Sequence, residues 1–140
     1  MRRALAAGVC LLVALVVLVP SAVGGHEATR PPVVKQAAGR FGTILARRDH
    51  KALYYWNVEK RDFKIHCTGA CAVAWPPLIV KTKAAVPRKI PGISGVFGTI
   101  RRPGGRLQVT RNRLPLYTYV NEGPYQVLCD DVDGWFVVRV

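Results

Sequence analysis

The chain has 140 residues, and its 21 basic and eight acidic side chains give a formal net charge of +13. This length fits one domain and excludes an enzyme built from a large catalytic domain and a separate binding domain. An apolar content of 50% excludes a disordered basic tail.

The N-terminal segment 1–24 has the pattern of a secretory signal peptide. Two arginines follow the initial methionine, an unbroken run of apolar or small residues covers 4–19, and Pro20 ends it. Small residues then stand where signal peptidase reads the chain, so we expect cleavage between Gly24 and Gly25. A retained N-terminal anchor is the alternative, although the run is short for a membrane-spanning helix. We therefore expect a secreted or extracytoplasmic protein associated with the cell envelope.

Residues 25–40 contain two adjacent prolines and no sustained periodicity, which predicts a flexible tether. The folded domain is expected over 41–140. In its first part, runs of β-branched and aromatic residues over 41–46 and 52–57 predict two strands of a hairpin. The following Thr68–Trp75 segment favours a short helical turn, which Pro76-Pro77 ends.

The second part of the domain repeats the first. Phe41-Gly42-Thr43-Ile44 recurs unchanged at 97–100, and LYYWNVE at 53–59 returns as LYTYVNE at 116–122. The wider spacing of the two landmarks in the second copy places seven extra residues there, around 106–113. Two landmarks in the same order indicate two related units that share one core. The expected boundaries are 41–80 for repeat one, 81–96 for a linker and 97–140 for repeat two.

The second copy has strand patterns over 97–102 and 107–110, joined by a turn rich in proline and glycine. Further strands are expected over 114–120 and 135–140. The sequence therefore predicts a mainly β fold, in which two related β-repeats share one core and Thr68–Trp75 adds one short helical turn.

Several of these segments are similar to a known family. They are the repeated Leu-Tyr-x-aromatic-x-x-acid motif, the CTGACAVAWPPL segment at 67–78, the Gly-Thr-Ile strand starts and the closing Trp-Phe-Val-Val. Together they resemble the bacterial "secreted repeat of unknown function" proteins, which are predicted lipoproteins with a Y-x-[FWY]-x-x-D motif. The resemblance covers 41–140 and implies an exported protein of the bacterial cell envelope. It implies no activity.

The chain departs from that family in two respects. Both motif acids are glutamates, Glu59 and Glu122, where the family usually has aspartate. Cys10 has a lipobox-like context, but nine apolar residues follow it, whereas the acceptor cysteine of a lipoprotein ends the apolar stretch. We therefore expect no lipid anchor.

The aromatic and acidic motif residues have two interpretations each. Because side chains alternate along a strand, the two aromatics of each copy share one face, and Tyr55 lies on the other. We expect these aromatics in the core, with a stacking platform for sugar rings or a quinone as the alternative. We expect the acids to cap turns or pair with cations, with the carboxylate pair of a hydrolase as the alternative. The six motif residues are Tyr54, Trp56, Glu59, Tyr117, Tyr119 and Glu122.

Three cysteines follow the predicted leader: Cys67, Cys71 and Cys129. A local Cys67–Cys71 disulfide is the first expectation in an exported protein. A bridge from either of these cysteines to Cys129 competes with it, because sequence alone does not decide connectivity. A copper or zinc site that adds His66 to the three cysteines is a further alternative, although the spacing matches no standard zinc motif.

The basic residues are spread along the chain rather than gathered in one run. Anionic envelope polymers or acidic lipids are the expected partners outside the cytoplasm, and nucleic acid is not expected because no recognition motif accompanies the charge. We assign no catalytic residues and no cofactor. The predicted function is that of an exported, non-catalytic protein that binds or scaffolds, and the alternative is a redox or metal-handling protein using His66, Cys67 and Cys71.

Overall fold

The computed structural model describes residues 30–140, so the predicted signal peptide and the first residues of the predicted tether lie outside the described part. Eight short strands dominate this part of the chain, with one short α-helix and three 3-10 turns. In chain order the elements are β1 (Val33–Ala37), η1 (Gly39–Phe41), β2 (Thr43–Arg47), β3 (Tyr54–Trp56), η2 (Asn57–Lys60), α1 (Ala70–Ala74), β4 (Ile79–Val80), η3 (Lys83–Ala85), β5 (Phe97–Arg101), β6 (Leu107–Arg111), β7 (Leu114–Pro115) and β8 (Trp135–Val137).

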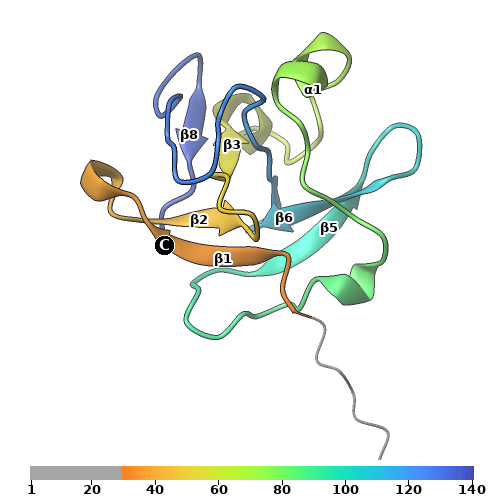
Figure 1. The fold of residues 1–140 in the computed structure, drawn as a ribbon. Helices are drawn as coiled ribbons and strands as arrows, with labels where there is room; N and C mark the ends of the chain where they lie inside the picture. The colour runs from red at the N-terminus through yellow and green to blue at the C-terminus, as the bar shows by residue number, and fades with distance from the viewer. Residues whose placement is uncertain (1–29) are drawn as a thin grey trace, which may run out of the picture.

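The strands form three small antiparallel sheets (Figure 1). β1 pairs with β2, β3 pairs with β8, and β6 pairs with β4, β5 and β7. The α1 helix lies inside the Thr68–Trp75 segment predicted to turn. The predicted fold class, mainly β with one short helical turn, is confirmed.

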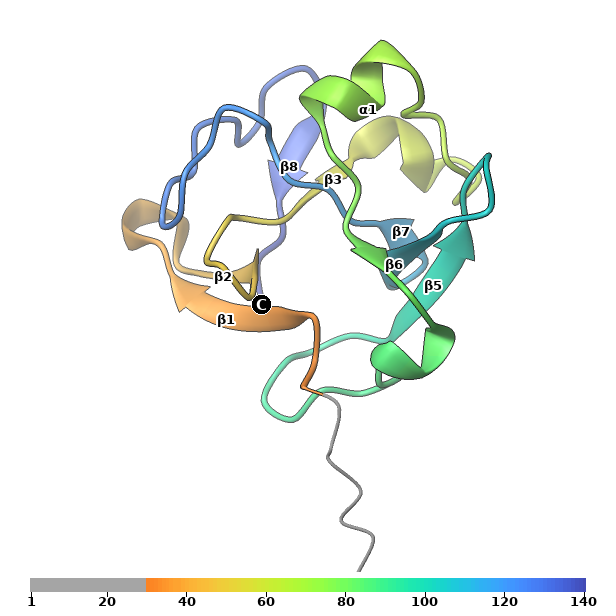
Figure 2. The same cartoon turned by 45° about the vertical axis from the view of Figure 1, so that its right-hand side comes forward.

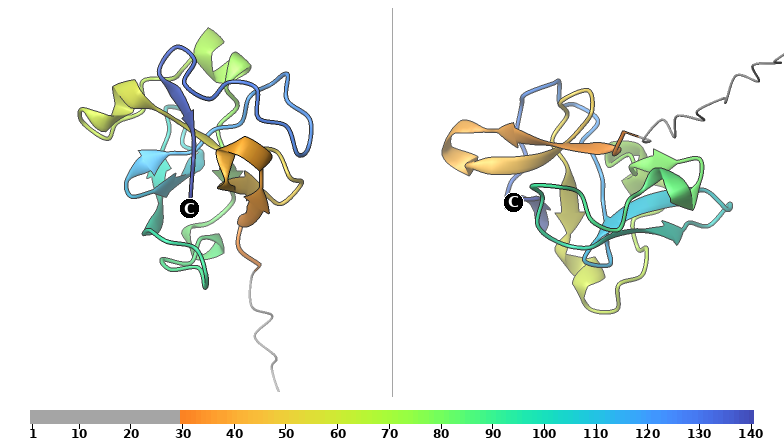
Figure 3. Two further views of the ribbon diagram at one scale, coloured as in Figure 1. Left: turned by 90° about the vertical axis from the view of Figure 1, so that its left-hand side faces the viewer. Right: turned by 90° about the horizontal axis from the view of Figure 1, so that it is seen from below.

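The two repeats match each other through their hairpins. In the first, Val33 pairs with Arg47. In the second, Phe97 pairs with Arg111, and both partners are shifted along the chain by the same number of positions. The first repeat is therefore built on β1–β2 and the second on β5–β6, and Figure 3 shows these two ribbons on either side of the chain that carries β3.

This match corrects two of the sequence predictions. β1 lies within the 25–40 range assigned to a flexible tether, because its pairing with β2 stabilises a strand that composition alone does not reveal. The two Phe-Gly-Thr-Ile tetrapeptides are not equivalent either. Gly42 has a φ of 74° and ends η1 just before β2, whereas Gly98 lies inside β5 and pairs with Thr110. The seven extra residues inferred near 106–113 are therefore not an insertion in the second repeat.

The final segment of each repeat crosses to the other one. In repeat one, the amide of Leu53 donates to the carbonyl of Leu45 at 3.0 Å. Val138, from the end of repeat two, forms hydrogen bonds with both of these leucines. Its carbonyl accepts from the Leu45 amide at 2.7 Å, and its amide donates to the Leu53 carbonyl at 2.8 Å.

The corresponding hydrogen bonds in repeat two have the same pattern. The amide of Leu116 donates to the carbonyl of Val109 at 3.0 Å, and Leu78 from repeat one completes the set. The Leu78 carbonyl accepts from Val109 at 2.8 Å, and its amide donates to Leu116 at 2.9 Å. Each repeat thus supplies the last strand segment of its partner, so that the two share one core.

Buried side chains from both repeats form that core. One cluster contains Leu45 and Leu53 together with Val109 and Leu116, which are their counterparts in the second repeat. The described residues contain no helix that is both long and apolar enough to cross a membrane.

Candidate functional site

The repeated tyrosines meet at the centre of the molecule. The backbone amide of Tyr54 donates to the carbonyl of Tyr117 at 2.8 Å, and the amide of Tyr117 donates back at 2.9 Å. Figure 2 shows this crossing, where the chain that follows β7 passes beside β3. Because each tyrosine makes the same contact with the other, the two repeats are related by an approximate two-fold axis at this point.

The motif glutamates bond across the same axis. Tyr54 donates its hydroxyl to Oε1 of Glu122, and Tyr117 donates its hydroxyl to Oε1 of Glu59 at 2.8 Å. Each carboxylate therefore holds the tyrosine of the other repeat. This exchange explains why the tyrosine and the acid recur at a fixed spacing.

Backbone amides also bond to Oε1 of each carboxylate, whereas Oε2 of each has no hydrogen-bond partner among the described residues. Oε1 of Glu59 accepts from the amide of His66 at 2.8 Å, and Oε1 of Glu122 accepts from the amide of Leu128 at 2.6 Å. Burial raises the pKa of Glu122 above its usual range, and the hydrogen bond from Tyr54 opposes that rise only in part. Burial also raises the pKa of both tyrosines.

The burial of both acids contradicts the hydrolase interpretation. Glu59 is 0% exposed and Glu122 is 2% exposed. A glycoside hydrolase needs both carboxyl groups beside a substrate and a water molecule. Neither carboxyl reaches solvent here, and each accepts from backbone amides and a tyrosine hydroxyl. The expected alternative of pairing with a cation is not found for either acid among the described residues.

The remaining motif aromatics, Trp56 and Tyr119, are partly buried and pack against the core. The rings of Trp56 and Trp135 stack at 5.4 Å between centroids, those of Trp135 and Trp75 at 3.9 Å, and Tyr119 lies 4.8 Å from Trp75. Trp75 and Trp135 are buried. The two partly buried rings thus pack on buried tryptophans, which agrees with the core interpretation.

The predicted local disulfide is confirmed. Cys67 and Cys71 are joined by a disulfide bond, which closes the turn leading into α1. Cys129 is free among the described residues, so a bridge from Cys129 to either of the other two cysteines is not formed. The alternative connectivity was reasonable because Cys129 holds nearly the place in repeat two that Cys67 holds in repeat one.

With the disulfide formed, the residues expected at a metal site do not make up a set of ligands. The disulfide leaves Cys67 and Cys71 without thiolates, and the ring Nε2 of His66 lies 3.0 Å from Oδ1 of Asp62. Among residues 30–140, no three histidine, cysteine or acidic side chains are grouped to hold a metal ion. Burial raises the pKa of Cys129, which favours the unreactive thiol.

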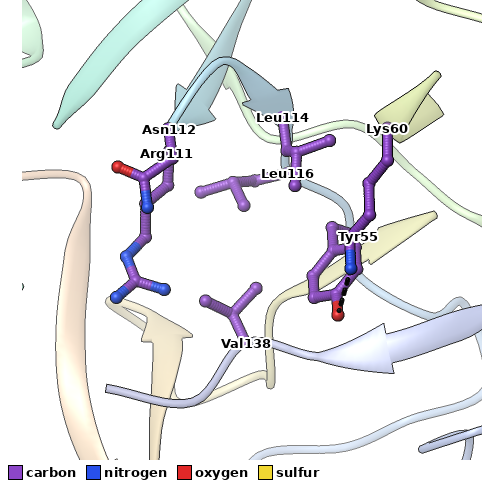
Figure 4. Close-up of a pocket in the computed structure, with 7 residues that line it drawn as sticks. All are labelled: Tyr55, Lys60, Arg111, Asn112, Leu114, Leu116 and Val138. Atoms are coloured by element: carbon purple, nitrogen blue, oxygen red, sulfur yellow. Dashed lines mark hydrogen bonds between the residues drawn. The ribbon is translucent and has the colours of Figure 1, made fainter. Parts of the chain in front are cut away.

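A pocket missed by the sequence reasoning lies between the two repeats. Its volume is about 200 Å³. Tyr55 and Lys60 form one wall, the end of β6 and the turn into β7 form the opposite wall, and apolar side chains lie between them (Figure 4). We call it the inter-repeat pocket, and it is lined by Tyr55, Lys60, Arg111, Asn112, Leu114, Leu116 and Val138. The one available signal was the alternation in β3, which turns Tyr55 away from the core aromatics.

The cations outnumber the surface acids. Within the described residues, Arg47 and Arg139 alone among the lysines and arginines form ion pairs, with Asp49 and Asp130 respectively. Two of the eight acidic residues in the chain are the buried motif glutamates. Arg102 is also buried, and the remaining exposed lysines and arginines of the described residues still far outnumber the exposed acids, so this surface is strongly cationic.

Comparisons with known proteins add no relatives: no family model, curated protein or solved structure matches this chain. The resemblance to the secreted repeat family stays an expectation drawn from the motifs.

Proposed function

We propose that this protein is an exported, non-catalytic scaffold of the cell envelope that binds anionic envelope polymers through its cationic surface. The observation that carries the proposal is the scarcity of ion pairs: most lysines and arginines of residues 30–140 have no carboxylate partner. Such a surface attracts polyanions over a distance set by the salt concentration.

The placement of the cations favours a flexible polymer over a flat lipid surface. Exposed cations occur on separate elements, including Arg48 after β2, Lys64 after η2 and Arg106 before β6. A membrane contacts one face of a protein, whereas a polymer chain follows charges over several faces. Nucleic acid is not proposed as a partner, because no recognition motif accompanies the charge and the chain is predicted to be exported.

The repeated residues support a scaffold rather than an enzyme. The motif tyrosines and glutamates are used in hydrogen bonds that join the repeats, and the motif tryptophan stacks on the buried Trp135. The inter-repeat pocket contains no carboxylate or histidine to act as a general base.

Binding of soluble poly(glycerol phosphate) to the chain without residues 1–24 tests the proposal. We expect binding at low salt that weakens steeply towards physiological salt, because polyanion binding releases counterions. Vesicles containing phosphatidylglycerol serve as the second arm. No binding at low salt, salt-insensitive binding, or tighter binding to the vesicles than to the polymer would each overturn the proposed polymer scaffold.

A further inference from the structure

The inter-repeat pocket combines two positive charges with an apolar floor. Leu116 and Val138 are 1% and 3% exposed, and Leu114 is partly buried beside them. Lys60 and Arg111 stand on opposite walls of the pocket (Figure 4). No acidic residue lines it, so the two charges are not compensated from within the pocket.

Neutral groups hold the Arg111 side chain in place. Its Nε donates to the carbonyl of Ser94 at 2.8 Å, its Nη2 donates to the Ser94 hydroxyl at 2.9 Å, and its Nη1 donates to the carbonyl of Arg139 at 3.0 Å. A guanidinium carries five N–H bonds. Two of them therefore have no partner within the described residues, and the group keeps its full positive charge at neutral pH.

Lys60 is held more loosely on the other wall. Its Nζ lies 3.2 Å from the Tyr55 hydroxyl and 4.5 Å from the centroid of the Tyr55 ring. The ring stacks on Phe136 at 5.7 Å, which fixes this wall of the pocket. The lysine can therefore turn towards a ligand while the aromatic wall keeps its place.

Residues related by the approximate two-fold axis differ at this pocket, so its lysine and its tyrosine occur on one side of the molecule only. Lys60 follows Glu59 directly, but Gly123 occupies the matching position after Glu122. Thr118 likewise stands where Tyr55 would recur, and its hydroxyl bonds to the carbonyl of Pro76. The residues that maintain the shared core are repeated, whereas those that make this pocket cationic and aromatic are not.

The matching arginine differs as well. Arg47 occupies the β2 position that corresponds to Arg111 in β6, and its guanidinium is paired with Asp49. The second side of the molecule thus lacks the tyrosine and the lysine at the matching positions, and its arginine is compensated by an acid. Packing demands are shared by both repeats, so they do not explain this difference.

We propose that the inter-repeat pocket binds a small amphiphilic carboxylate, which is an aromatic ring or short alkyl group carrying one carboxyl. The apolar body packs against Leu116 and Val138 beside the Tyr55 ring, and the carboxylate lies between Lys60 and Arg111. The volume of about 200 Å³ is below the usual range for drug-sized ligands and fits a ring of benzoate size. This site is independent of polymer binding by the wider surface.

Titration of the chain without residues 1–24 with benzoate, followed by NMR chemical shifts, tests the site. We expect saturable shifts confined to the pocket-lining residues. Benzyl alcohol lacks the charge and acetate lacks the ring, so both should bind at least about tenfold more weakly. Equal binding of benzyl alcohol would contradict the role of the cations, and equal binding of acetate would contradict the role of the apolar floor.

Two matched variants separate the pocket from general surface charge. Lys60→Gln should weaken benzoate binding about tenfold, because it removes one charge-assisted hydrogen bond. Lys64→Gln removes an exposed cation outside the pocket and should leave benzoate binding unchanged. Polymer binding should respond to both variants to a similar extent. Equal effects of both variants on benzoate binding would overturn the proposed site without affecting the polymer proposal.

Discussion

The Tyr117 hydroxyl is the clearest case of one atom joining the two repeats. The change Tyr117→Phe removes the donor to Glu59 and leaves a buried carboxylate with fewer hydrogen bonds. We expect the free energy of unfolding to fall by about 1–3 kcal/mol. Urea denaturation measures the loss, and Tyr125→Phe is the control because Tyr125 is 65% exposed. Equal stability of the two variants would show that the cross-repeat bond contributes nothing.

Glu122 makes the stability depend on pH. Burial raises its pKa in the folded state, so the folded chain binds a proton more tightly than the unfolded chain. The contribution to stability is complete below the unfolded pKa and is lost as the pH rises through the folded pKa. Glu122→Gln should therefore flatten the decline in the free energy of unfolding above about pH 4.3, the usual glutamate value.

Asp49 supplies a control of opposite sign. The hydrogen bond from the Arg47 guanidinium lowers the pKa of Asp49 to about 2, and burial opposes this only in part. Its contribution is present above the ordinary aspartate pKa and disappears as the pH falls towards the folded value. Denaturation curves between acidic and neutral pH should therefore change in the acidic range for Asp49→Asn, where Glu122→Gln has little effect. If the free energy of unfolding of Glu122→Gln declined above about pH 4.3 as steeply as that of the wild type, Glu122 would not be the source of this pH dependence.

The disulfide acts at the scale of one element, the turn that leads into α1. Its two cysteines are four residues apart, so it closes a short loop and should contribute about 2 kcal/mol. Reduction should lower the denaturant concentration at the midpoint of unfolding. Below that concentration, the reduced protein should keep the circular dichroism signal of its β-sheets. Complete unfolding on reduction would mean that the helix turn is needed for the whole fold.

The disulfide also determines how many thiols can react with an alkylating reagent. Alkylation of the exported, unfolded protein without reductant should add one label, at Cys129, and prior reduction should raise the number to three. Intact mass measures both states. Three labels without reductant would contradict the disulfide and reopen the metal-handling interpretation. The same spectrum shows whether the chain begins at Gly25, as expected for cleavage of the signal peptide.

The strand class and the helical turn could be predicted because they depend on local sequence. Runs such as Leu53–Trp56 carry the aromatic residues that favour strands, and Pro76 ends the helical segment. β1 was missed because only its pairing with β2 makes it a strand. The identical Phe-Gly-Thr-Ile segments were misaligned for the same reason, since neighbouring strands determine their conformations.

The site was less predictable than the fold. The spacing of tyrosine and glutamate in the motif indicated a structural role. It did not reveal that Tyr54 bonds to Glu122 of the other repeat, because the two residues are 68 positions apart. The inter-repeat pocket draws on three separate segments of the chain, and no local pattern brings them together. The unequal pair Lys60 and Gly123 was visible in the repeat, although only the structure shows that the difference lies at a pocket.

At the scale of the whole molecule, neither repeat should fold without the other. Leu78 completes the second repeat and Val138 completes the first, so each isolated repeat lacks a strand segment and exposes core side chains. Fragments 30–96 and 97–140 should each be unfolded alone and regain β structure when mixed in equal amounts. Circular dichroism and size-exclusion chromatography measure this outcome. A cooperative unfolding transition in either isolated fragment would show that the exchange is dispensable.

The central claim is a division of labour, in which repeated residues maintain the fold and unrepeated residues bind. Thermal unfolding of the wild type, Tyr117→Phe and Lys60→Gln, each with and without benzoate, tests it most directly. Tyr117→Phe should lower Tm but keep the rise in Tm that benzoate causes, because the pocket is intact. Lys60→Gln should keep the wild-type Tm without ligand and lose most of that rise. Loss of the benzoate effect in Tyr117→Phe, or its full retention in Lys60→Gln, would contradict the claim.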